Sequence, residues 1–188
     1  MFIFSRFDYR RFETIAFPLF VISFIMLLAV FIPGLGASGG GANRWLRIGS
    51  VTIQPAEIIK LTGIIFLATL FKKNWRFFPF ASIVVSVTIV TAILQRDLGS
   101  TVVFVASSAM LYFAAGAPIW QFLIALPISA ISLGALIIAF PYRSKRVTAF
   151  LDPFSDPQGF TYHIVQVLIA LGSGGLFGLG LGHSRQKF

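Results

Sequence analysis

Cysteine is absent from the 188 residues, which excludes a disulfide framework and a zinc site built on thiolates. Acidic residues are scarce, with 6 Asp and Glu against 15 Lys and Arg, and charged residues make up only 11% of the chain. A soluble domain carries about 25% charged residues, so this sequence does not describe one. Disorder is excluded as well, because 57% of the residues are apolar and 22 are Phe. The class that remains is an integral membrane protein.

Uncharged apolar stretches recur along the chain and are long enough to cross a bilayer core of about 30 Å as helices. We expect five crossings, at about residues 14–32, 53–71, 77–95, 98–115 and 119–141. Pro33 and the glycine-rich segment after it end the first helix and predict a flexible loop. The predicted fold class is therefore all-α, a polytopic helical bundle that forms a single membrane domain over residues 1–188.

Residues 142–188 differ from the rest of the chain. Their apolar run, Ile164 to Leu171, is too short to span and continues into GSGGLFGLGLG. Glycine permits tight backbone turns inside a protein-lined cavity. We therefore expect a re-entrant or interfacial segment here in place of a sixth crossing.

The net charge of +9 restricts the partners. On a membrane protein, such an excess favours anionic lipid head groups and an anionic lipid-linked substrate. Nucleic acid is not an expected partner, because most of the surface faces lipid. Five crossings place the two ends on opposite faces, and the basic residues divide evenly between those faces. Hydropathy and charge alone therefore do not orient the chain.

Two groups of residues are candidates for chemistry. Glu57 and Lys60 are three residues apart and share a helix face, and Asp97, at the end of a crossing, could join them. Ionisable groups in a membrane suggest a functional site, but a structural ion pair near the interface explains this pair equally well. Arg143 and Arg146 could bind a phosphate bidentately, although a solvated loop is the ordinary alternative. No residue is assigned to a metal, and a divalent-cation requirement stays open.

Three segments resemble the signature blocks of the SEDS family, the shape, elongation, division and sporulation proteins. They are GANRWLRIGSVTIQPAEIIKL, LQRDLGST and RVTAFLDPFSDPQGFTYHIVQVLIALGSGGLFGLGLGHSRQK, in the family's order. The ending GLGLGHSRQKF is more similar to the FtsW and SpoVE branch than to RodA. The resemblance covers nearly the whole chain.

The resemblance implies a function and an orientation. Family members polymerise lipid II, an undecaprenyl-pyrophosphate-linked substrate, at the outer face of the bacterial cytoplasmic membrane, together with a class B penicillin-binding protein. By this resemblance, residues 142–188 form an outer loop, and the intact protein is a multi-pass peptidoglycan glycosyltransferase for cell division or cell shape. The alternatives are a lipid II flippase and an inactive membrane scaffold.

The motif residues carry over position by position. Gln54, Glu57 and Lys60 match the block QPSE…K, and Asp97 lies in a block written QPDLGT in the family, where this chain has Arg96 for the proline. We name Gln54, Glu57, Lys60 and Asp97 the polar cluster. The residues expected to contact the substrate are Arg143, Arg146, Gln166 and Lys187.

The ends of the chain depart from the family. Family members have roughly ten transmembrane helices, about twice what this length can hold. Phe188 falls just before the block LPE-x-HTD, whose aspartate is the proposed catalytic base. The expectation is therefore an internal piece that has no assigned catalytic residue and is inactive on its own.

Overall fold

The computed structural model describes residues 10, 12–39, 42–73, 77–157, 159–175 and 178–180. They fall into two compact units, Met1–Ile119 and Trp120–Phe188, which are described separately. The first unit contains, in chain order, α2 (Phe12–Ala29), β1 (Gly36–Gly39), β2 (Ala42–Ile48), β3 (Val51–Ile53), α3 (Pro55–Lys73), α4 (Phe77–Thr88), the π-helix η2 (Ile89–Leu94) and α5 (Leu98–Ala114). The second contains α6 (Ile119–Ala139), α7 (Pro141–Leu151) and α8 (Tyr162–Gly174).

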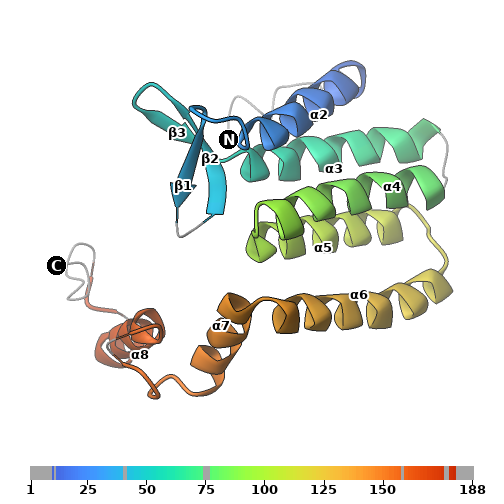
Figure 1. The fold of residues 1–188 in the computed structure, drawn as a ribbon. Coiled ribbons are helices and arrows are strands. Elements are labelled where there is room, and N and C mark those ends of the chain that lie inside the picture. The colour runs from blue at the N-terminus through green and yellow to red at the C-terminus, as the bar shows by residue number, and fades with distance from the viewer. Residues whose placement is uncertain are drawn as a thin grey trace. The chain divides into compact units, whose positions relative to one another are not determined.

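The helices of the first unit lie side by side, with the sheet at one end (Figure 1). α3 packs against both α2 and α5, and α4 packs against α5. The buried core joins Leu27 of α2, Ile59 of α3, Val87 of α4 and Phe104 of α5. Large apolar side chains elsewhere point outward, such as Phe17 and Val102, which are at least half exposed. An apolar exterior is what a bilayer requires, so the first unit has the surface of a membrane protein.

Each of the five predicted segments overlaps a helix or, for residues 77–95, α4 followed by η2. Within the described residues, three stretches are long and apolar enough to cross a membrane: Phe12–Ala29, Phe77–Leu94 and Ile119–Ala139. α3 carries charges at both ends, and α5 has 17 residues. The helical membrane fold is confirmed, whereas five as the number of crossings stays a prediction.

The prediction of a flexible loop after Pro33 is wrong. An antiparallel three-stranded sheet in the order β1-β2-β3 is formed by Gly36–Gly39, Ala42–Ile48 and Val51–Ile53, with Ala37 opposite Trp45 and Arg47 opposite Thr52. The glycine at position 36 is required by packing, because a Cβ there would overlap the carbonyl oxygen of Val30. The absence of a side chain thus allows the first strand to start directly against the end of α2.

The elements described in the second unit are the helices α6, α7 and α8. α6 has 21 residues and contains Pro127, which membrane helices tolerate. α7 begins with a proline at its first position, where the missing N–H costs nothing. The run Ile164 to Leu171 lies inside α8, whose 13 residues are about 20 Å long. That length is short of a bilayer core, and the re-entrant or interfacial assignment stays a prediction.

The contact between α3 and α5 can be tested at Gly63. A Cβ added there would lie 2.7 Å from the ring of Phe104, which is fully buried. We expect Gly63→Ala to destabilise the full-length protein by about 1–3 kcal/mol, the usual cost of overpacking. Thermal unfolding in detergent measures this. The matched control is Gly134→Ala in α6, where a Cβ meets nothing within 4 Å, and equal effects of the two changes would contradict the tight contact.

Candidate functional site

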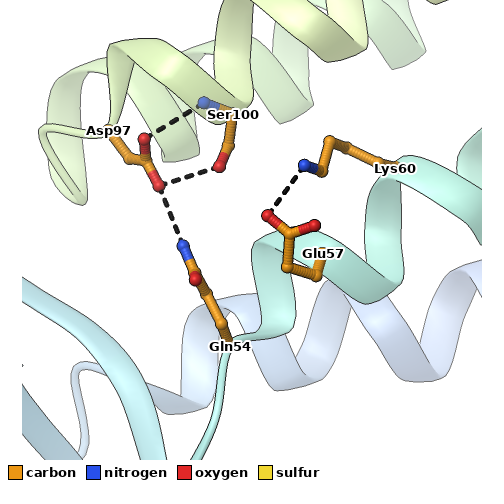
Figure 2. A network of polar contacts seen from close by, with 5 residues as sticks. All are labelled: Gln54, Glu57, Lys60, Asp97 and Ser100. Atoms are coloured by element: carbon orange, nitrogen blue, oxygen red, sulfur yellow. Dashed lines mark hydrogen bonds and ion pairs between the residues drawn. The ribbon is translucent and has the colours of Figure 1, made fainter. Parts of the chain in front are cut away.

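The polar cluster gathers at the sheet end of the first unit. Gln54 stands between β3 and α3, while Glu57 and Lys60 follow in the first turns of α3. Asp97 is the N-cap of α5. Figure 2 shows Gln54 and Asp97 pointing toward one another, with the Glu57–Lys60 pair beside them. The four residues identified from the sequence therefore lie together.

Asp97 binds two different segments through its carboxylate. Its Oδ1 accepts a hydrogen bond from the backbone N–H of Ser100 at 3.1 Å, and its Oδ2 accepts one from the Ser100 hydroxyl at 2.9 Å. The same Oδ2 accepts a hydrogen bond from Nε2 of Gln54 at 3.2 Å. The side chain caps a helix whose N-terminus favours negative charge, and it is 7% exposed. Asp97 is thus a buried carboxylate with both oxygens engaged.

Glu57 and Lys60 form the ion pair that their spacing predicts. Lys60 Nζ donates to Glu57 Oε1 at 2.7 Å, and the side chains of Lys60 and Glu57 are 22% and 59% exposed. Asp97 does not join this pair directly. Among the described residues, its side-chain partners are Gln54 and Ser100, so Gln54 links Asp97 to the start of α3.

Two further residues at this end, Gln95 and Arg44, were not identified as site residues from the sequence. Gln95 is fully buried and donates from Nε2 to the carbonyl of Leu27 at 2.8 Å. Arg44 of β2 donates to the carbonyls of Gln95 and Arg96. The family-like block around Asp97 was the available signal for Gln95. Arg44 gave only a positive charge in the sequence, because its contacts are 51 and 52 residues away.

The π-helix η2 leads directly into the cluster. Its wider turn lets the N–H of Gln95 donate to the carbonyl of Val90 at 2.9 Å, and the N–H of Asp97 then donates to the carbonyl of Thr91 at 2.8 Å. The hydroxyl of Thr101 bonds to that of Thr91 at 2.8 Å and to the Asp97 carbonyl at 2.6 Å. Short π segments occur often at functional sites. Here the segment sets where the Asp97 backbone lies.

The residues of the second unit that were predicted to contact the substrate differ in how far their side chains are exposed. Arg143 is 6% exposed, donates to the carbonyl of Leu136 at 3.2 Å and stacks 4.4 Å from the centre of the Phe140 ring. Arg146 is exposed on α7, and Gln166 is partly exposed on α8. Lys187 lies outside the described residues. Arg146 therefore presents its charge at the surface of this unit, whereas Arg143 packs against the end of α6.

Two roles of Asp97, helix cap and negative charge, can be separated by substitution. Asp97→Ala removes both and should cost about 1 kcal/mol of stability, the usual value of a lost N-cap. Asp97→Asn keeps a good cap without the charge, so we expect it to unfold within a few degrees of the wild type. Thermal unfolding of the full-length protein in detergent checks this. Equal losses for both variants would contradict a capping role.

The Glu57–Lys60 pair can be tested with a double-mutant cycle of Glu57→Gln and Lys60→Met. Because the Glu57 carboxylate is 59% exposed, we expect a coupling free energy of about 0.2–1 kcal/mol, as for other exposed pairs. Stability of the full-length protein in detergent provides the four values. A coupling of several kcal/mol would show a desolvated pair and would contradict the exposure seen here.

Comparisons with known proteins agree on one family. The sequence profile of the family described as "Cell cycle protein" (FtsW, RodA and SpoVE) matches residues 1–188. Stage V sporulation protein E of Bacillus subtilis (strain 168) is 39% identical over 196 aligned positions, covering 100% of this chain and 53% of that protein. The probable peptidoglycan glycosyltransferase FtsW of Aliivibrio salmonicida (strain LFI1238) is 42% identical over 177 positions, covering 90% of this chain and 44% of that protein.

Solved structures share the fold. A chain from work on the structural coordination of polymerization and crosslinking by a peptidoglycan synthase complex matches with a TM-score of 0.71 at 29% identity, over 93% of this chain and 53% of that one. The rod shape determining protein RodA of Thermus thermophilus, crystallised as an aspartate-to-alanine variant, matches with a TM-score of 0.59 at 26% identity, over 74% and 45% of the two chains. The chain spans about half the length of these relatives. With a family profile that matches along its whole length, the chain belongs to the FtsW/RodA/SpoVE (SEDS) family, and its relatives confirm the FtsW and SpoVE branch.

Proposed function

We propose that this chain is part of a peptidoglycan glycosyltransferase that polymerises lipid II at the outer face of the bacterial cytoplasmic membrane. The observation that carries the proposal is the family match over residues 1–188. It is supported by the structure, in which the motif residues Gln54, Glu57, Lys60 and Asp97 lie together at one end of the helices. Several relatives bear the name peptidoglycan glycosyltransferase.

In the proposed reaction, the acceptor sugar hydroxyl attacks the anomeric carbon of the donor, and the lipid pyrophosphate leaves. A carboxylate must accept the hydroxyl proton. Asp97 is an unsuitable base, because its two oxygens already accept three hydrogen bonds. Glu57 is paired with Lys60. We therefore assign these two carboxylates to shaping the site and assign no base within the polar cluster.

Cations are needed where the pyrophosphate develops charge. Arg146 is our candidate for this role, since it is exposed on α7 and its guanidinium can hold phosphate oxygens bidentately. Lys187 and Gln166 remain candidates from the family resemblance. Arg143 is assigned a supporting role, because its side chain is buried against Phe140 and the Leu136 carbonyl.

The proposed partner is a class B penicillin-binding protein. The supporting observation is the match to a chain from a peptidoglycan synthase complex, in which polymerization and crosslinking are coordinated. A transferase that makes glycan strands needs a crosslinking activity beside it, and penicillin-binding proteins of this class supply one. Membrane lipids surround the exposed apolar side chains of the helices.

The test of the proposed function uses the purified full-length protein and labelled lipid II in detergent micelles, where no lipid has to cross a bilayer. Glycan strands separated by gel electrophoresis are the expected product. A flippase would move lipid II between leaflets of vesicles and form no polymer in micelles. Absence of polymer with and without the penicillin-binding protein would overturn the proposal.

Arg146 offers a specific prediction within this function. Arg146→Ala should weaken lipid II binding by the full-length protein about tenfold, since charge-assisted hydrogen bonds contribute about 1.5–3 kcal/mol. Arg146→Lys should restore only part of the affinity, because lysine lacks the planar fork. Binding in nanodiscs measures the change. Lys145→Ala removes an exposed charge from the neighbouring position and is the matched control, and an equal loss there would remove Arg146 from the site.

A further inference from the structure

We propose that Arg44 is a positioning residue for the polar cluster. It holds the Gln95–Arg96 turn, which directly precedes Asp97, from the side of the sheet. The three-stranded sheet, and not only the helices, therefore fixes the geometry of the site. The catalytic consequence rests on the proposed glycosyltransferase function. The structural consequence does not, and the experiments below separate the two.

The contact joins one side chain to two successive carbonyls. Arg44 Nε donates to the carbonyl of Gln95 at 3.2 Å, and Arg44 Nη2 donates to the carbonyl of Arg96 at 2.9 Å. A guanidinium presents several donors in a rigid plane, so it can hold two acceptors at a fixed separation. A lysine ammonium has no such fixed fork. The chemistry of the contact therefore calls for arginine in particular.

The turn needs support because its backbone is unfavourable. Arg96 has φ +55, and it is the one residue other than glycine with positive φ in the described part of the chain. A side chain with a Cβ disfavours this left-handed region, and such conformations persist only where the surroundings impose them. Arg44 binds the carbonyls on both sides of the strained φ angle. It is thus placed to stabilise the conformation that the turn does not favour by itself.

The turn is also held from inside the bundle. Gln95 donates its side-chain amide to the carbonyl of Leu27 in α2, and the N–H of Asp97 donates to the carbonyl of Thr91 in η2. Arg44, on β2, reaches the same turn from the sheet. Loss of Arg44 therefore releases the outer side of the turn and leaves the inner anchors in place.

The residue after the turn is Asp97, whose carboxylate contacts Gln54 and caps α5. A shift of the Gln95–Arg96 backbone moves this carboxylate directly, since no flexible segment separates them. Displacements of about 1 Å can cost as much as 10²-fold in rate when catalytic geometry is set by positioning. The effect expected from loosening the turn is thus on turnover rather than on substrate affinity.

The first experiment measures the turn itself. In the full-length protein without substrate, backbone amide hydrogen exchange over residues 95–101 should become at least about tenfold faster in Arg44→Gln, because local opening exposes these amides. Arg47→Gln is the matched control: it lies on the same strand, has the same charge and an exposed side chain, and its backbone N–H bond to the Leu35 carbonyl is kept. Equal exchange in the two variants would overturn the proposal.

The second experiment tests the strained φ angle. If Arg44 stabilises the left-handed conformation at position 96, Arg96→Gly should restore slow exchange to Arg44→Gln, because glycine adopts positive φ without a steric cost. Arg96→Ala removes the same side chain without that freedom and should not rescue. Rescue by both substitutions, or by neither, would contradict the role assigned to Arg44.

The third experiment connects the turn to turnover. With lipid II, Arg44→Gln should lower kcat about tenfold or more and leave KM nearly unchanged, with Arg44→Lys between it and the wild type. Arg47→Gln should keep both constants. A raised KM with unchanged kcat would show that Arg44 binds substrate and would overturn positioning. A wild-type protein that forms no polymer would defeat the proposed function, while the exchange measurements would still decide the role of Arg44.

Discussion

A single carboxylate, that of Asp97, connects segments that are far apart in the sequence. It caps α5 through Ser100, and it accepts a hydrogen bond from Gln54, which is 43 residues earlier and directly precedes α3. The backbone N–H of the same residue bonds back to η2. Because α3, η2 and α5 all meet at this residue, the relative placement of the motif residues depends on where its backbone lies. The sheet, η2 and the buried Gln95 are best understood as devices that fix this position.

The polar atoms around Asp97 illustrate a constraint that a membrane imposes. Water is scarce inside a bilayer, so buried polar groups must find partners within the protein. The hydroxyls of Thr91 and Thr101 bond to each other and to backbone carbonyls at 2.6–2.8 Å. Gln95 donates from its side-chain Nε2 to the carbonyl of Leu27. A π-helix changes which backbone groups pair with one another, and these side-chain hydrogen bonds supplement the altered backbone pairing.

The sequence allowed the helices, the Glu57–Lys60 contact and the family to be predicted, because each depends on local spacing or on motif identity. Uncharged length identifies helices, and a separation of three residues places two side chains on one face. The sheet was not predicted because β1 is rich in glycine, which has little strand propensity. Its pairing partner, strand β2, lies in a segment that resembles a family signature block. The π-helix has no local signal. Arg44 contacts the carbonyl of Gln95, and Asp97 contacts Gln54, each across more than 40 residues of sequence. Only the tertiary structure brings these positions together.

The distribution of polarity in the first unit matches the substrate class proposed for it. Its helix surfaces carry exposed apolar side chains such as Phe17, Ile25 and Val102, whereas Gln54, Glu57, Lys60 and Asp97 lie together where the sheet joins the helices. A lipid-linked sugar has the same two parts, an apolar tail and a charged head. The apolar surface lets the tail pack away from water. A polar site at a helix end keeps ionised groups near the interface, where their desolvation costs least. Under the proposed function, an end-on polar site on an apolar bundle would let the head group reach the polar cluster while the tail stays in the membrane.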